Sequence, residues 1–189
     1  MKYMKNKLLT ILLPLLPIMV CSTMSASQGH REKYTGVLRH YSQNASDSLK
    51  YKAALFVIDN MEGHCSPEGK AMDSFISHIR TMKKAKGIRE LQTAWNSSLR
   101  EGRVEIVPDS MVVTDEFLIN DIDNAYNSWQ QSQWKDSITF SLFCRYILPY
   151  RINDEHFGGN WRESLRKQYA AVIEGVSDMR KAFAIVRDT

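Results

Sequence analysis

The stretch "TDEFLINDIDNAYNSW", from Thr114 to Trp129, indicates which kind of fold the chain adopts. Thr114 stands directly before two acidic residues, which is typical of a helix start because a hydroxyl caps the first turn and acids favour the positive end of the helix dipole. Its apolar residues recur at steps of three and four, the spacing of one helix face: Phe117, Leu118, Ile122, Ala125, Tyr126 and Trp129. We therefore predict an amphipathic helix with one face in a core.

Helical spacing and helix-start signals recur on both sides of this stretch. They predict helices over roughly Glu32–Tyr41, from Asp47 or Ser48 to Gly63, from Ser66-Pro67-Glu68 onward, over Ile88–Leu99, and from Thr139 onward. Only the segment around Val104 and Ile106 alternates, and Pro108 excludes it from a central strand. The prediction is an all-α fold, an irregular multi-helix bundle over residues 32–189.

The C-terminal segment predicts one long helix with a heptad pattern. Asn160 and Glu163 have the spacing of a capping box. Behind them, apolar residues alternate in steps of four and three, which defines a narrow seam: Leu165, Tyr169, Val172, Val176, Met179, Phe183 and Val186. The seam packs either onto the core of the bundle or onto another chain or domain. Gly175 within it costs about 1 kcal/mol relative to alanine.

The N-terminus resembles an export signal. Lys2, Lys5 and Lys7 precede Leu8–Val20, a run of 13 uncharged residues that is too short for a comfortable membrane span. We expect a signal peptide over residues 1–20, possibly to 26, and a tether over 21–31. Cys21 fits lipidation of a bacterial lipoprotein, although Val20 is unusual before it, and ordinary cleavage near Ser25 or Ala26 is the alternative. Either reading places the protein outside the cytoplasm, in the periplasm or anchored to the outer membrane.

Composition narrows the function classes. Three of the 25 Lys and Arg residues lie in the signal, which leaves 22 against 21 acidic residues. No basic stripe interleaved with aromatic residues is present, so nucleic-acid binding has no support. Cys65 and Cys144 could form a disulfide after export or stay as buried thiols.

The segment "FCRYILPYRINDEHFGGNWR", Phe143–Arg162, contains a cysteine and a histidine and therefore raises the question of catalysis. Cys144 lies one residue after Phe143 and three before Ile147, inside the apolar stripe of the predicted helix, where burial disfavours the thiolate that a nucleophile needs. Nothing places His156 beside it. His64, Cys65 and His78 lack zinc-ligand spacing. We expect no catalytic residue, metal or cofactor in this chain.

Three stretches together resemble the helical N-terminal region of large bacterial envelope proteins that carry a transglutaminase-like domain. They are "LKYKAALFVIDNMEGHCS" (Leu49–Ser66), "EFLINDIDNAYNSW" (Glu116–Trp129) and "FSLFCRYILPYRINDEHFGGNWRESLRKQY" (Phe140–Tyr169). The resemblance covers most of residues 45–170, and its most specific part is Tyr-Ile-Leu-Pro-Tyr-Arg. His156 departs from the Glu-Pro pair that is usual in the family after the arginine.

The resemblance implies a non-catalytic accessory module that binds a catalytic domain or another envelope protein. The papain-like catalytic part of the family has no counterpart here, since its Gly-x-Cys motif is missing. The resemblance implies a packing or interface role for Tyr146, Pro149, Tyr150, Arg151, Trp161 and Arg162. The running apolar pattern at the C-terminus and the missing catalytic core suggest a truncated or split reading frame. The alternative is an independent exported binding or structural protein that associates through its C-terminal helix.

Arg151 has a specific predicted role. Pro149 should end the preceding helix near Leu148, because it lacks a backbone donor and restricts the residue before it. Arg151 would then lie where unpaired carbonyls attract a cation. We expect its guanidinium to bind those carbonyls or a carboxylate such as Asp154 or Glu155.

Overall fold

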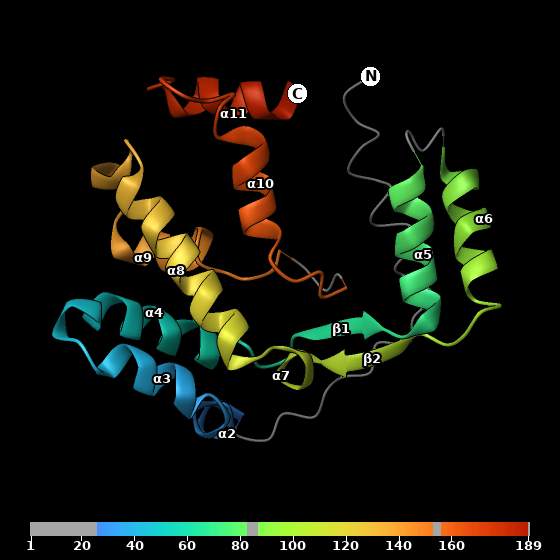
Figure 1. Cartoon of the computed structure of the whole chain (residues 1–189), viewed down its shortest axis with the longest axis horizontal. Coiled ribbons are helices and arrows are strands. Elements are labelled where there is room, and N and C mark those ends of the chain that lie inside the picture. The colour runs from blue at the N-terminus through green and yellow to red at the C-terminus, as the bar shows by residue number, and fades with distance from the viewer. Residues whose placement is uncertain (1–25, 83–86, 153–155, 189) are drawn as a thin grey trace. The chain divides into compact units, whose positions relative to one another are not determined.

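The computed structural model describes residues 26–82, 87–152 and 156–188, with side chains from residue 29 onward (Figure 1). This part of the chain is mostly helical, so the predicted all-α class is confirmed at that level. It divides into two compact units. Residues 67–106 form the smaller one, here called the hairpin unit; 26–66 and 107–188 form the larger one, here called the core unit.

The core unit contains eight α-helices in its described part, and two short 3-10 turns. The helices are α2 (Ala26–Lys33), α3 (Thr35–Ser42), α4 (Ser48–Asp59), α7 (Asp109–Val112), α8 (Asp115–Gln131), α9 (Phe140–Tyr146) and α10 (Trp161–Tyr169), and α11 (Met179–Asp188) follows after a turn; the 3-10 turns are η2 (Ala45–Asp47) and η3 (Lys135–Ser137). The predicted tether ends sooner than expected, because α2 already begins at Ala26. Arg31 in α2 forms an ion pair with Asp59 at the end of α4, at 2.5 Å.

The hydrophobic core of this unit joins α3, α4, α8 and α9. The predicted helix from Thr114 is confirmed, and the Thr114 hydroxyl accepts a hydrogen bond from the Phe117 backbone. Thr139 caps α9 in the same way. The core takes most of its residues from the predicted stripes, with Ala54 and Ile58 of α4 in addition: Tyr34, Val37, Tyr41, Ala53, Ala54, Val57, Ile58, Met61, Leu118, Ile122, Ala125, Trp129, Phe143 and Leu148. The rings of Trp129 and Phe143 stack with centroids 4.6 Å apart.

The expected helix start at Ser66-Pro67-Glu68 is wrong. These residues belong to β1 (Cys65–Glu68), which pairs with β2 (Glu105–Pro108) in a two-stranded sheet. The arrows of the two strands run in opposite directions in Figure 1. The Ser66 hydroxyl is fully buried and donates to the Asp109 carboxylate rather than capping a helix. Gly69, with φ +106°, turns the chain into α5 (Lys70–Thr81) instead.

The hairpin unit consists of α5, α6 (Ile88–Ser98) and the strand residues that flank them. Phe75 and Trp95 pack edge to face between the two helices, with centroids 5.0 Å apart. Only Ala71, Ala94 and Ser98 of these two helices are fully buried within the described chain. The helix predicted over Ile88–Leu99 is confirmed to within a residue.

The single long C-terminal helix is not present. The Asn160 cap is confirmed, since its side chain accepts from the Glu163 backbone and its amide donates to the Glu163 carboxylate at 3.1 Å. The chain leaves the helical path after Tyr169, turns at Gly175 with φ +74°, and begins α11 at Met179. The Asp178 carboxylate caps α11, because it accepts hydrogen bonds from the backbone amides of Arg180 and Lys181.

Two side chains outside the C-terminal segment form hydrogen bonds to the backbone between α10 and α11, where the helix is interrupted. The Gln133 amide donates to the Val176 carbonyl at 2.5 Å, and the Trp134 indole donates to the Ser177 carbonyl at 2.6 Å. A continuous helix would need those carbonyls for its own backbone bonds. Figure 1 accordingly shows α10 and α11 running in different directions. The heptad spacing is therefore a feature of the sequence that the fold does not use as one seam.

Some expectations fall on residues that the structure does not describe. The signal peptide, the lipidation site Cys21 and the cleavage sites at Ser25 all lie outside the described residues. Among the helices that are described, none combines the length and the apolar character that a membrane crossing requires.

Candidate functional site

The turn after α9 places four of the six residues singled out by the sequence in one polar cluster. Helix α9 ends at Tyr146, and the backbone amides of Ile147 and Leu148 both bond to the Phe143 carbonyl, at 3.0 and 2.9 Å. Pro149 then redirects the chain, as predicted. The carbonyls of residues 147–149 consequently lack helical partners.

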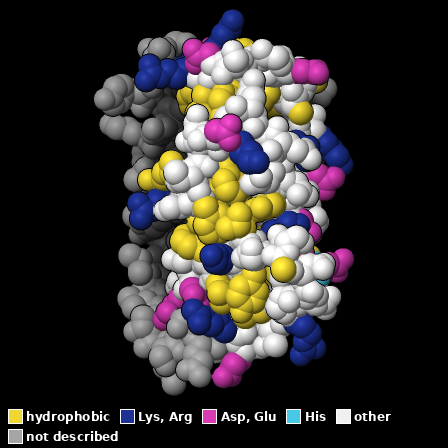
Figure 2. All heavy atoms as spheres, turned by 90° about the vertical axis from the view of Figure 1, so that its left-hand side faces the viewer, with side chains coloured by type: hydrophobic (Ala, Val, Ile, Leu, Met, Phe, Trp, Pro, Cys, Tyr) yellow, Lys and Arg dark blue, Asp and Glu magenta, His cyan; other side chains and the backbone are white. Residues whose placement is uncertain are grey.

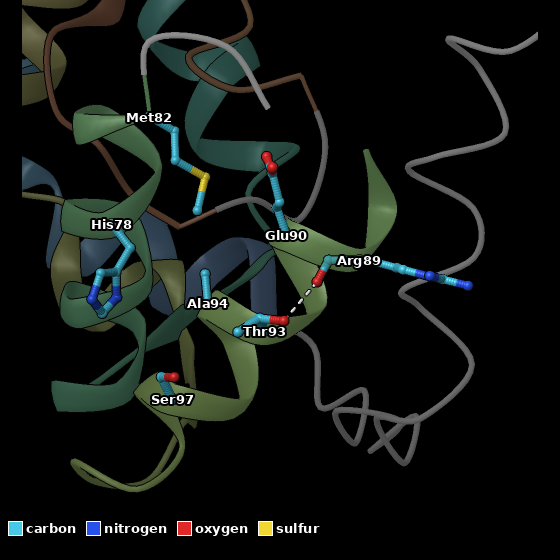
Figure 3. A pocket seen from close by; sticks show the side chains of 7 residues that line it. All are labelled: His78, Met82, Arg89, Glu90, Thr93, Ala94 and Ser97. Carbon is cyan, nitrogen blue, oxygen red and sulfur yellow. Dashed lines mark hydrogen bonds between the residues drawn. The ribbon is translucent and has the colours of Figure 1, made fainter. Parts of the chain in front are cut away.

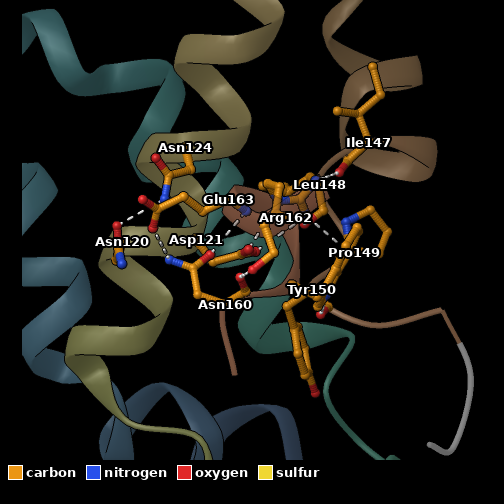
Figure 4. A network of polar contacts seen from close by, with 12 residues as sticks. Asn120, Asp121, Asn124, Ile147, Leu148, Pro149, Tyr150, Asn160, Arg162 and Glu163 are labelled. Atoms are coloured by element: carbon orange, nitrogen blue, oxygen red, sulfur yellow. Dashed lines mark hydrogen bonds and ion pairs between the residues drawn. The ribbon is translucent and has the colours of Figure 1, made fainter. Parts of the chain in front are cut away.

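Arg162, at the start of α10, supplies donors to all three carbonyls (Figure 4). Its guanidinium bonds to Ile147 at 2.7 Å, Leu148 at 3.2 Å and Pro149 at 3.0 Å. The same guanidinium pairs with the Asp121 carboxylate of α8, with Nε 3.0 Å from Oδ1. Asp121 is only 3% exposed, so this ion pair is largely shielded from water. Arg162 therefore ties the end of α9, the middle of α8 and the start of α10 together.

Trp161 reinforces the same joint. Its indole nitrogen donates to the Tyr150 carbonyl at 2.6 Å, and the Arg162 guanidinium lies 4.8 Å from the centre of its ring. A cation over an indole face adds electrostatic attraction to the packing. The helix-end role expected of Arg151 is thus carried by Arg162, eleven residues later.

Arg151 instead lies in a second cluster around the buried carboxylate of Asp109. Asp109 is fully buried and accepts from the Tyr150 hydroxyl at 2.7 Å and the Ser66 hydroxyl at 2.9 Å. It also forms an ion pair with Arg151, which is 7% exposed. The Asp109 backbone amide donates to the His64 carbonyl at 2.9 Å. Asp154 and Glu155, the other predicted partners of Arg151, are outside the described residues.

This cluster satisfies the conditions for burying a charge. A buried carboxylate is costly unless it is paired and hydrogen-bonded, and Asp109 has one cation and two hydroxyl donors. Burial, together with the hydrogen bond to Asp109, raises the pKa of the Tyr150 hydroxyl, so the phenol stays a donor at neutral pH. The four side chains connect the strand residue Ser66, the start of α7 and the turn after α9.

A pocket of about 300 Å³ opens beside this cluster, in the core unit. Its lining comes from α4, the end of α9 and the turn: Phe56, Val57, Asn60, His64, Arg145, Pro149, Tyr150, Arg151 and Ile152. The pocket thus contains three of the six residues singled out by the sequence. Two of its lining residues, Tyr150 and Arg151, are buried and bonded to Asp109.

Large hydrophobic side chains face solvent next to the pocket. Tyr146 is 71% exposed, Ile152 is 84% exposed and Leu142 is 44% exposed. Leu142 and Tyr146 are four residues apart on α9, so they share a helix face. Tyr146 is the one residue of the six that points away from the buried clusters.

Cys144 is confirmed as a core residue. It is 4% exposed, it is not joined to Cys65, and burial raises the pKa of its thiol to about 11. A thiol with that pKa is almost entirely protonated at neutral pH and is a poor nucleophile. Within the described residues, no cluster of three or more His, Cys, Asp or Glu side chains offers a metal site.

The Cys144 environment predicts slow alkylation and a loss of stability in base. The raised pKa means that the folded state holds the thiol proton more tightly, so this contribution to stability is complete below about pH 9 and is lost as pH rises toward 11. In a Cys21→Ser, Cys65→Ser chain at pH 8, iodoacetamide should label Cys144 about a hundredfold more slowly in the folded protein than in urea. Equal rates in the two conditions would contradict the buried position.

The hairpin unit contains a separate groove between α5 and α6 (Figure 3). It is lined by His78, Met82, Arg89, Glu90, Thr93, Ala94 and Ser97, with a volume of about 390 Å³. The Thr93 hydroxyl donates to the Arg89 carbonyl at 2.8 Å, and the Arg89 side chain points away from His78. No buried charge supports this groove among its described residues, and we regard the pocket beside α9 as the better candidate site.

Sequence reasoning missed the acidic partners, Asp109 and Asp121. Asp121 had a signal: it lies three residues after Leu118 and four before Ala125, on the apolar stripe of α8, where a carboxylate needs a cation. Asp109 had no comparable signal, because it begins a four-residue helix after Pro108 and its partners are about 40 residues away in sequence. Only the fold brings it to Arg151.

Comparisons of the chain with protein-family models, with curated proteins and with solved structures found no match.

Proposed function

We propose that this chain is a non-catalytic accessory module of the kind found in exported transglutaminase-like proteins, and that it binds a catalytic domain or another envelope protein. The proposal rests on the resemblance of residues 45–170 and on one structural observation. Within the segment Phe143–Arg162, some side chains are held by contacts inside the protein and others are exposed. Arg151, Trp161 and Arg162 of this segment are tied into the protein. Tyr146 and Ile152 are directed at solvent.

A fixed backbone that exposes large hydrophobic side chains is suited to binding. Exposed apolar clusters on a soluble protein often mark interaction sites, and tyrosine is enriched among the residues that dominate interface energies. The anchoring bonds of Arg162 reduce the ordering cost of binding, since the turn is already held in place. In this proposal the protein is exported by its N-terminal signal and is held at a membrane only by a lipid on Cys21, if that residue is modified.

A second candidate is an independent exported protein that associates through its C-terminal helix. One observation favours it: Phe183 and Met179, four residues apart on α11, are 67% and 47% exposed. These two side chains form an apolar strip on one helix face. The strip is shorter than the predicted seam, because the turn at Gly175 separates it from α10.

One experiment distinguishes the two candidates. The mature chain is titrated by calorimetry against a transglutaminase-like catalytic domain encoded in the same genome, and its self-association is measured by sedimentation velocity. In the first proposal, Tyr146→Ala weakens binding to the domain tenfold or more without lowering Tm, whereas Phe183→Ala has no effect. If Phe183→Ala abolishes self-association while Tyr146→Ala changes nothing, the second candidate replaces the first.

A further inference from the structure

The described lining of the pocket beside α9 combines apolar side chains with positive charge. Phe56, Val57 and Pro149 supply the apolar surface, and Asn60 and His64 supply polar groups. Among the described residues that line it, the charged side chains are Arg145 and Arg151, both cationic, and none is an Asp or Glu. The charge of Arg151 is balanced by Asp109 behind it. The net positive charge of the lining therefore comes from Arg145.

Arg145 is placed to receive a ligand. It lies in the last turn of α9, is exposed, and forms no ion pair or hydrogen bond within the described part of the chain. An arginine fork on a pocket rim matches a carboxylate in a bidentate geometry. Leu142, one turn before Arg145, and Ile152 add exposed apolar surface around that cation.

The surface on this side of the molecule has the same mixed character. Figure 2 shows the left-hand side of Figure 1, where hydrophobic side chains gather in separate groups with both basic and acidic side chains beside them. A partner that complements the described pocket lining itself needs an apolar side chain beside a negative charge. A purely apolar partner would leave the cations desolvated and unpaired.

We propose that the pocket binds an acidic peptide segment in which a carboxylate is flanked by an apolar side chain. The carboxylate pairs with Arg145, and the apolar side chain enters the 300 Å³ pocket against Phe56 and Pro149. Tyr150 and Arg151 form a rigid part of the lining, because Asp109 holds both. This inference rests on the proposed binding function and specifies the chemistry of the partner segment.

The test uses two small peptides as probes, acetyl-Leu-Glu-Leu-amide and its neutral counterpart acetyl-Leu-Gln-Leu-amide. Each is titrated into the ¹⁵N-labelled mature chain at 0.15 M salt, and amide chemical shifts are followed by NMR. We expect the Glu peptide to shift the signals of Val57, Arg145 and Ile152, with an affinity about tenfold higher than that of the Gln peptide. Arg145→Gln should remove that difference. Arg39→Gln, which changes an exposed arginine on α3, should leave it intact.

Three outcomes would overturn the proposal: no shifts at the pocket, equal shifts with both peptides, or an unchanged preference in Arg145→Gln. Binding that appears only in an Asp154→Asn, Glu155→Gln chain would assign the pocket to the protein's own carboxylates and would overturn it as well. The peptide assay does not involve the catalytic domain. A chain that binds the domain through Tyr146 but ignores both peptides therefore keeps the proposed function and loses this inference.

Discussion

Replacing Asp109 by alanine should destabilise the core unit by about 3–5 kcal/mol, the cost of breaking a buried ion pair from one side. Asp109 is fully buried, and its removal breaks the buried ion pair with Arg151, which is 7% exposed. The hydroxyls of Ser66 and Tyr150 lose their acceptor in the same step. Urea denaturation followed by circular dichroism measures the free energy of unfolding, and the midpoint should fall without a change in slope.

Two further variants separate charge from volume. Asp109→Asn keeps the shape of the side chain but not its charge, so a loss in the same range would identify the broken ion pair with Arg151 as the cause. Asp109→Ala combined with Arg151→Ala should lose less than the sum of the two single losses. Asp136→Ala, at an exposed acid in η3, is the matched control and should stay within about 0.5 kcal/mol of the parent. A loss below 1 kcal/mol in Asp109→Ala would contradict the buried pair.

Arg162→Ala is expected to cost about 3 kcal/mol or more. The substitution removes the arginine that pairs with the carboxylate of Asp121, which is 3% exposed. It also removes the donors to three carbonyls at the end of α9. Arg162→Lys should recover only part of the loss, since one ammonium group cannot match the planar fork that reaches the carboxylate and the carbonyls together. Thermal unfolding of both variants and of the parent provides the comparison.

The partner residue supplies the decisive measurement for Arg162. In a double-mutant cycle with Asp121→Asn, the coupling energy should exceed 1 kcal/mol, because the two side chains are in direct contact and shielded from water. Arg166→Ala, one turn later on α10 and exposed, is the control and should have a small effect. A coupling energy near zero would mean that Arg162 acts through the carbonyls alone.

The helices of the core unit were predictable because their signals are local. Thr114 and Thr139 cap α8 and α9, and the apolar stripes that follow them form the core, as their spacing indicates. The failures share a cause, namely that a distant contact overrides a local signal. Ser66 and Pro67 look like a helix start, but the Ser66 hydroxyl is taken by Asp109, 43 residues later. The C-terminal heptads look continuous, but Gln133 and Trp134 bind the carbonyls at the break.

The location of the candidate site could be predicted from the sequence, but its hydrogen bonds and ion pairs could not. The Pro149 turn and its arginines stand out in the sequence, and the structure brings Tyr150, Arg151, Trp161 and Arg162 into two adjoining clusters. The assignment of the two arginines could not be made from sequence, since either lies within reach of a helix end. Arg151 pairs with the carboxylate on α7, and Arg162 takes the helix end, because the turn returns α10 to the carbonyls of residues 147–149.

The contact between Ser66 and Asp109 also has a topological consequence. The core unit is discontinuous in sequence: its chain departs at Ser66, and it resumes at Val107 after the hairpin unit. The side chain of Ser66 and the carbonyl of His64 both bond to Asp109. The core-unit residues just before and just after the hairpin unit are therefore hydrogen-bonded to each other. Loop-closure entropy grows only logarithmically with loop length. The hairpin unit is therefore a natural insertion point, where evolution or an engineer can lengthen, shorten or exchange a segment at little cost to the host domain.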